Sequence, residues 1–136
     1  MEIQGWGVTK EEMELQIDAL YRPGSYSDGA SLCRALLEQV DPLWQSARLY
    51  LVLNLAAQDL YEEALEEVVG LEPETLFEGL RLLTFGAGTD SEEQLYEDIV
   101  GYLEALGLHK ELEQFFSTKI LSPSVQQLQS SFEIQY

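Results

Sequence analysis

Apolar residues recur every three or four positions along most of the chain, which is the spacing that places them on one face of an α-helix. The first such segment has its apolar positions at Met13, Ile17, Leu20 and Tyr21. Thr9 and Glu12 precede this segment with the spacing of a capping box. No alternation of apolar and polar residues runs long enough to predict a β-strand. The pattern therefore predicts an all-α fold.

Prolines, glycines and capping residues divide this pattern into about six to seven helices. The expected ranges are about 10–21, 26–40, 43–57, 60–69, 74–85, 90–106 and 108–116. The expected N-caps of the third, fourth and sixth helices are Asp41, Asp59 (with Glu62) and Asp90 (with Glu93). From Ser117 the sequence is polar with scattered apolar residues. We therefore expect one helical domain over residues 1–116 and a polar, partly ordered C-terminal tail over residues 117–136.

Two of the expected helices begin in the same way. Tyr26 and Tyr61 lie 35 residues apart, and each is followed three residues later by a small residue, Gly29 or Ala64. An aromatic side chain at such a position would wedge between the two helices of a pair, and a small residue would let helix backbones approach where they cross. This spacing and pattern resemble the tetratricopeptide repeat. The resemblance implies antiparallel helix pairs stacked in a superhelical array over about residues 10–106.

The third pair departs from the pattern, since residues 86–88 lengthen its turn and no aromatic residue is followed by a small one at the proper spacing. A generic helical bundle is the alternative. Residues 47–65 and 76–86 also resemble the small type III secretion chaperones that hold the needle subunit. That resemblance implies a non-enzymatic chaperone that sequesters an amphipathic helix of its partner. It also implies a second small helical protein as co-chaperone.

In a stacked array the first helix of each pair lines the concave face. The apolar and small residues that would form a groove for a partner helix there are Leu49, Tyr50, Leu53, Ala56, Ala57, Phe77 and Leu80. However, the third helix is apolar on most sides, which is also typical of a buried helix. The alternative is therefore that Leu49 and Leu53 are core residues covered by the fifth helix or by the tail. If Leu53 lines a groove, replacing it with glutamate should abolish partner binding and leave helicity largely intact. Collapse of the fold would instead show that Leu53 is a core residue.

The net charge of the chain limits the classes of molecule that it can bind. Among 136 residues, 7 are Lys or Arg and 25 are Asp or Glu, which gives a net charge of −18. Phosphate backbones and anionic lipid surfaces would repel such a chain. We therefore expect that it neither binds nucleic acid nor inserts into a membrane. Cys33 is the single cysteine and can form no internal disulfide, and the first residues lack the pattern of a signal peptide. We expect a cytoplasmic protein.

No set of residues predicts an enzyme. His109 is the single histidine, and neither it nor Cys33 has a partner at the spacing of a catalytic or metal-binding motif. We therefore expect no catalytic residue, no metal site and no cofactor. The sequence favours a protein-binding chaperone or adaptor. The alternative function is a tetratricopeptide-like scaffold subunit of a larger intracellular multiprotein assembly.

Overall fold

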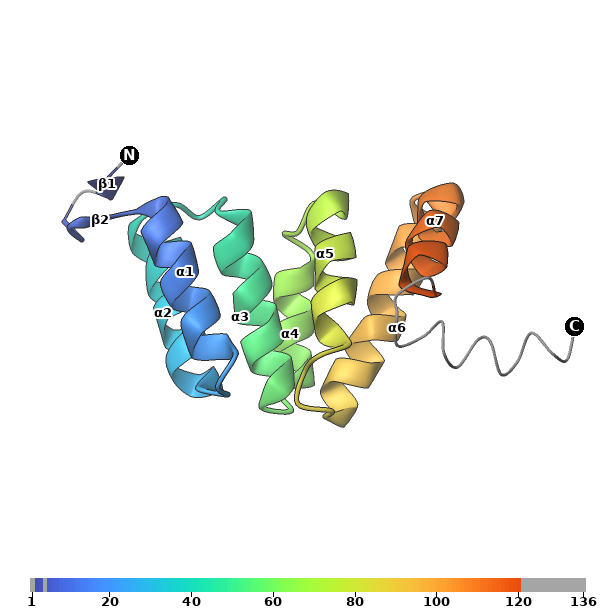
Figure 1. The fold of residues 1–136 in the computed structure, drawn as a ribbon, viewed down its shortest axis with the longest axis horizontal. Helices are drawn as coiled ribbons and strands as arrows, with labels where there is room; N and C mark the ends of the chain where they lie inside the picture. Colours follow the sequence, from blue (N-terminus) through green and yellow to red (C-terminus); the bar gives the residue numbers. More distant parts are fainter. Residues whose placement is uncertain (1, 4, 121–136) are drawn as a thin grey trace, which may run out of the picture. The chain divides into compact units, whose positions relative to one another are not determined.

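The computed structural model describes residues 2–3 and 5–120 of the chain (Figure 1). The described residues form seven α-helices and one two-stranded ribbon, so the expected all-α fold is confirmed. The helices are α1 (Lys10–Tyr21), α2 (Tyr26–Gln39), α3 (Gln45–Ala57), α4 (Tyr61–Val68), α5 (Pro73–Leu83), α6 (Asp90–Ala105) and α7 (His109–Ile120). Helix α7 thus continues past residue 117, and the rest of the expected tail lies outside the described residues.

Two short strands, β1 (Glu2–Ile3) and β2 (Val8–Thr9), precede α1 and pair in antiparallel fashion. Each strand has two residues, which is too short for an alternating pattern to reveal it in the sequence. The chain divides into two compact units, Met1–Ile99 and Val100–Tyr136, with the boundary inside α6. The first unit carries α1 to α5 and the beginning of α6, and it contains the candidate site described below.

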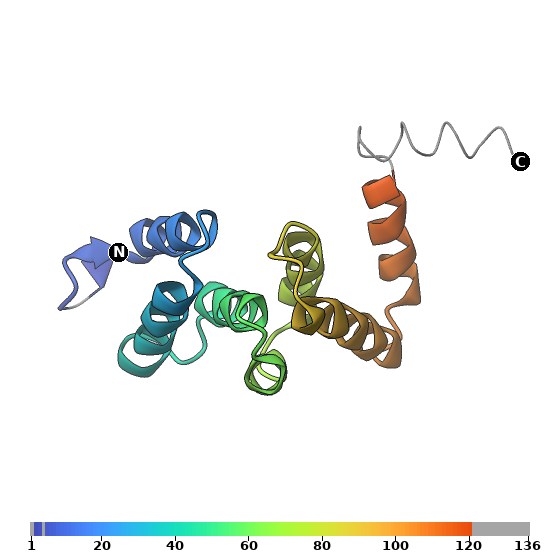
Figure 2. The same ribbon diagram turned by 90° about the horizontal axis from the view of Figure 1, so that it is seen from below.

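Helix α3 forms the centre of the first unit. It contacts α1, α2, α4 and α5. Figure 2 views these helices nearly end-on and places α1 and α5 on one side of α3 and α2 and α4 on the other. Nine of the 13 residues of α3 are buried, including every position from 51 to 57. A helix surrounded on several sides needs apolar residues around most of its circumference, which is the pattern seen in its sequence.

The closest approach to α3 comes from α2. A Cβ atom built on Gly29 would lie 2.8 Å from Oδ1 of Asn54, whose side chain is fully buried. The small residue therefore allows a close helix crossing. The crossing joins α2 to the first helix of the following pair, whereas the prediction concerned the two helices of one pair. Asn54 is held by its Nδ2 group, which donates a 2.7 Å hydrogen bond to the carbonyl of Tyr50.

Tyr26 and Tyr61 occupy the same place in their helices, the first residue of α2 and of α4. The ring of Tyr26 packs against Tyr21 of α1, with centroids 5.6 Å apart, so it contacts the other helix of its pair. The hydroxyl of Tyr61 instead donates a hydrogen bond to Asp98 of α6. The two tyrosines therefore share a position and differ in their contacts.

The expected N-cap of α1 is confirmed. The amide of Glu12 donates to Oγ1 of Thr9 at 3.1 Å, and the amide of Thr9 donates to Oε1 of Glu12 at 3.0 Å. The capping box at α6 lies one residue before the expected pair. It is formed by Thr89 and Glu92, because the amide of Glu92 donates to Oγ1 of Thr89 and the amide of Thr89 donates to Oε1 of Glu92.

The caps predicted at Asp41 and Asp59 are wrong. Helix α3 begins at Gln45, and Asp41 instead accepts a hydrogen bond from the amide of Leu43 in the preceding turn. Asp59 lies one residue before the N-cap of α4, has a φ of +63°, and accepts hydrogen bonds from the amide and hydroxyl of Ser91. Its carboxylate thus links the α3–α4 turn to α6. Sequence spacing alone did not reveal this tertiary partner.

The Gly29–Asn54 crossing predicts the effect of one added methyl group. Gly29→Ala should lower the free energy of unfolding by about 1–3 kcal/mol, because the new Cβ overpacks against a buried side chain. Gly101→Ala is the matched control: Gly101 also lies inside a helix, and nothing is within 4 Å of its Cβ position. That substitution should stabilise the protein by up to about 1 kcal/mol. Urea denaturation measures both, and equal effects would contradict the close crossing.

Candidate functional site: a pocket between α1 and α5

Most of the residues predicted to form the groove lie in the core. The exposed fractions of their side chains are 4% for Leu49, 0% for Leu53, Ala56 and Leu80, and 8% for Ala57. Tyr50 and Phe77 are partly exposed. A buried side chain offers a partner no surface. The alternative stated for Leu49 and Leu53, that they are core residues, is therefore the one that their burial supports.

Helix α5 is one of the elements that bury α3. A Cβ atom built on Gly79 would lie 3.1 Å from Cδ1 of Leu49, so α5 approaches α3 closely at this point. At the end of α3, the hydroxyl of Thr89 donates a 2.6 Å hydrogen bond to the carbonyl of Ala56. The groove expected along α3 is thus largely filled by neighbouring elements of the same chain.

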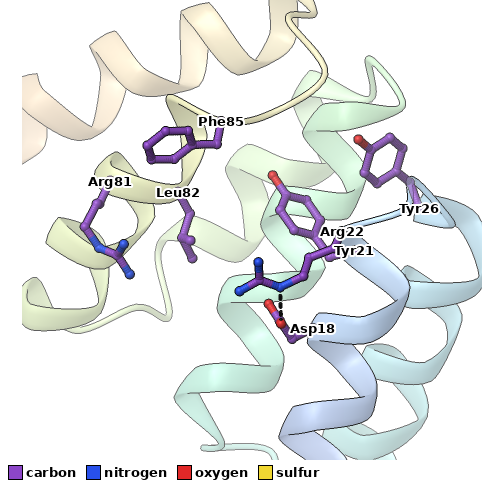
Figure 3. A pocket seen from close by; sticks show the side chains of 7 residues that line it. All are labelled: Asp18, Tyr21, Arg22, Tyr26, Arg81, Leu82 and Phe85. Atoms are coloured by element: carbon purple, nitrogen blue, oxygen red, sulfur yellow. Dashed lines mark hydrogen bonds and ion pairs between the residues drawn. The ribbon is translucent and has the colours of Figure 1, made fainter. Parts of the chain in front are cut away.

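A pocket remains on the side of α3 where α1 and α5 lie. Its volume is about 430 Å³. One wall is formed by the end of α1 and the start of α2, and the other by the second half of α5 (Figure 3). The residues that line it are Asp18, Tyr21, Arg22, Tyr26, Arg81, Leu82 and Phe85.

Asp18 organises the α1 wall. Its carboxylate accepts a 2.9 Å hydrogen bond from the hydroxyl of Tyr50 and a second one from Nε of Arg22. Burial alone would raise the pKa of Asp18, but the hydrogen bonds from Arg22 and Tyr50 outweigh it and hold the pKa below its usual value. Burial and the Asp18 carboxylate together raise the pKa of Tyr50 to about 12. Both groups therefore keep their charge states at neutral pH.

Two guanidinium groups face one another across the pocket from α1 and α5, those of Arg22 and Arg81 (Figure 3). Arg81 forms an ion pair with Glu78 on its own helix, as Arg22 does with Asp18. The side chains of Arg22 and Arg81 are 78% and 56% exposed, so each keeps part of its guanidinium accessible. The chain has only seven Lys and Arg residues, and two of them line this pocket.

Three tyrosines pack together behind the arginines. The ring of Tyr21 has its centroid 5.6 Å from those of Tyr26 and Tyr50. Tyr21 is 8% exposed, and its hydroxyl is buried with no hydrogen-bond partner among the described residues. Burial, with a smaller effect from the charge of Glu92, raises the pKa of Tyr21 well above its usual value. Tyr21 is thus a neutral, unsatisfied polar group at the pocket.

The other feature of the pocket is apolar. Phe85 lies two residues after the end of α5 and is 77% exposed, and Leu82 in the last turn of α5 is partly exposed. A large aromatic side chain left in water next to a concave site is typical of a binding surface. The site therefore combines an exposed aromatic residue, two guanidinium groups and a buried hydroxyl.

The α5 wall of the pocket was not predicted from the sequence. Arg81, Leu82 and Phe85 belong to one helical turn and its continuation, and Phe85 stands directly before Gly86, where the helix was expected to end. The signal available in the sequence was this aromatic residue at a helix end, together with an arginine in a chain poor in basic residues. That α1 lies on the opposite side of the pocket is tertiary information.

The described residues offer little for catalysis. Cys33 is fully buried, and burial raises the pKa of its thiol to about 12. His109 is exposed at the start of α7. Among the residues whose side chains are described, no three of the types His, Cys, Asp and Glu are grouped so that they could hold a metal ion.

Comparisons with known protein families, curated proteins and solved structures found no match to the chain. Within residues 2–3 and 5–120, no helix combines the length and apolar character that a membrane span requires.

The burial of α3 predicts the effect of a charge at its centre. Leu53→Glu should abolish cooperative folding, because it places a carboxylate where the side chain is 0% exposed and has no cationic partner. Leu15→Glu on α1 is the matched control, since Leu15 is 72% exposed. It should leave the melting temperature nearly unchanged. Circular dichroism during heating measures both, and a normal melting curve for Leu53→Glu would contradict the core position of Leu53.

The contacts of Tyr21 and Tyr50 predict opposite changes in the free energy of unfolding when the hydroxyl of each is removed. Tyr21→Phe should raise the free energy of unfolding by about 1 kcal/mol, because it removes a buried hydroxyl that has no partner. Tyr50→Phe should lower it by about 1 kcal/mol, because it removes the hydrogen bond to Asp18. Urea denaturation compares the two variants. Destabilisation by Tyr21→Phe would mean that this hydroxyl has a partner after all.

Proposed function

We propose that the chain is a non-enzymatic, cytoplasmic chaperone or adaptor that binds an amphipathic helix of a partner protein at the pocket between α1 and α5. The observation that carries the proposal is Phe85, an aromatic side chain 77% exposed beside a pocket of about 430 Å³. An amphipathic helix offers apolar residues for Phe85 and Leu82 and polar residues for the arginines and tyrosines. This binding surface replaces the groove first expected along α3.

The charge distribution supports a protein partner. Glu62, Glu63 and Glu66 are exposed on α4, which lies on the other side of α3 from α1 and α5 (Figure 2). These carboxylates would keep a complex in solution while the pocket is occupied. The net charge of −18 favours a partner that is basic overall, and steering by this charge weakens as salt concentration rises.

The resemblance to type III secretion chaperones leads us to propose a needle subunit as the partner. A needle subunit is a small helical protein that assembles with itself, and a helix held by another chain is unavailable for that assembly. Under this proposal the protein keeps such a partner monomeric until the partner is released. No reaction is needed, and the function depends on differential affinity for the free subunit.

Co-purification of the full chain from native extract, followed by mass spectrometry, tests the proposal. We expect one small helical protein that self-assembles when it is separated from the chain. Phe85→Asp should reduce its recovery at least tenfold, since burying a phenylalanine contributes about 1.5–3 kcal/mol. Val69→Asp is the matched control, because Val69 is 80% exposed and does not line the pocket.

Two results would contradict the proposal. Equal recovery of the partner with Phe85→Asp and Val69→Asp would place the binding surface elsewhere. Recovery of many large subunits in fixed proportion would instead support the alternative, a scaffold subunit of a larger assembly.

A further inference from the structure

We propose that the pocket selects its partner by binding one side-chain carboxylate of the partner's helix between Arg22 and Arg81. This inference rests on the proposed function and specifies the chemistry of its partner. It is carried by the two guanidinium groups that face one another across the pocket and by the buried hydroxyl of Tyr21, which has no partner among the described residues (Figure 3).

The accessible polar groups of the two arginines are all donors. A guanidinium carries five N–H donors and no acceptor. Arg22 uses Nε on Asp18, and Arg81 uses Nε and Nη2 on Glu78. Both arginines thus retain N–H groups for which no hydrogen bond to a described residue exists. Such donors bind acceptor groups, and an ionised carboxylate is the protein side chain that forms the strongest hydrogen bonds with a guanidinium, because it is charged and only accepts.

Tyr21 provides the independent observation. Its side chain lines the same pocket, it is 8% exposed, and its hydroxyl makes no hydrogen bond with the described residues. An unsatisfied buried hydroxyl destabilises the free protein, so its presence calls for an explanation. A ligand that accepts a hydrogen bond at the pocket gives the hydroxyl the partner that it lacks. The hydroxyl that destabilises the free protein then contributes to the affinity for the ligand.

Acidic side chains also lie near the two arginines and Tyr21. Asp18 and Glu78 pair with the two arginines, and Glu92 is close enough to act on Tyr21. A carboxylate between the guanidiniums has the two cations as nearest neighbours and the acids behind them. Because Coulomb energy falls with distance, the attraction to the cations exceeds the repulsion by the acids. A phosphate carries up to twice the charge, which increases both its attraction to the two guanidiniums and its repulsion by the chain's net charge of −18, so the experiment compares the two anions directly.

The spacing of the α5 wall defines the pattern on the partner. Arg81 lies in the last turn of α5, Phe85 lies two residues beyond the end of that helix, and both side chains line the pocket. A partner helix that packs along this wall presents its carboxylate one turn from the apolar residue that contacts Phe85. The expected motif is therefore one Asp or Glu three or four residues from a large apolar residue, in a helix that is otherwise basic or neutral.

A phage-displayed library of helical peptides, selected on the full chain, provides the probe. We expect the selected peptides to share one acidic position one turn from an apolar residue, although the negative charge of the bait favours basic peptides elsewhere. A selected peptide is then synthesised with a C-terminal amide and with Glu, Gln or phosphoserine at that position. Calorimetry should show that Glu binds at least tenfold more tightly than Gln.

Variants of the chain test which residues cause the tighter binding of the Glu peptide. Against the double variant Arg22→Gln/Arg81→Gln, the advantage of Glu over Gln should disappear, which is the signature of a direct coupling in a double-mutant cycle. Tyr21→Phe should reduce the same advantage. Arg34→Gln is the control, since Arg34 pairs with Glu63 and does not line the pocket. It should leave the advantage unchanged, and circular dichroism checks that every variant is folded.

Three results would overturn the inference. They are the absence of an acidic position among selected peptides, an advantage of Glu that persists in the double variant, and tighter binding of phosphoserine than of Glu. If peptides bind in a Phe85-dependent manner without a carboxylate, the proposed function stands and this inference fails. If no helical peptide is selected, both fail.

Discussion

Burial of the central helix α3 is the constraint on which the rest of the first unit depends. Nine of its 13 residues are buried, and four other helices contact it. Each buried leucine contributes about 1.5–3 kcal/mol, so the leucines at 49, 51, 53 and 55 are a major source of stability. Two glycines permit this arrangement: Gly29 of α2 lies against Asn54, and Gly79 of α5 lies against Leu49. The positions of α1 and α5, and therefore of the pocket, follow from their packing on α3.

This constraint also explains the chemistry of the candidate site. Because α3 is covered, the accessible surface beside it is formed by the ends of α1 and α5, where charged residues are tolerated. The pocket thus has guanidinium and tyrosine groups together with one exposed phenylalanine, where an apolar groove was expected. Asp18 connects the pocket to α3, since it accepts a hydrogen bond from Arg22 at the pocket and another from Tyr50 of α3.

The sequence predicted the helices well because their patterns are local. The capping box at Thr9 and the breaks at Pro23 and Gly70 are readable within a few residues. The caps at Asp41 and Asp59 were wrong because their side chains have other partners, and the partner of Asp59, Ser91, lies 32 residues away. The pocket could not be predicted for the same reason. An apolar residue on α3 has the same local pattern whether it faces a partner or α5, and only the tertiary packing at Gly79 distinguishes the two.

The central claim is that partner binding occurs where α1 and α5 face each other and leaves the core around α3 unchanged. Hydrogen–deuterium exchange of the chain with and without its co-purified partner tests this claim most directly. We expect added protection in residues 18–26 and 78–86, which contain the lining residues, and little change in α4. Added protection confined to α2 and α4, with no change beside the pocket, would contradict the account.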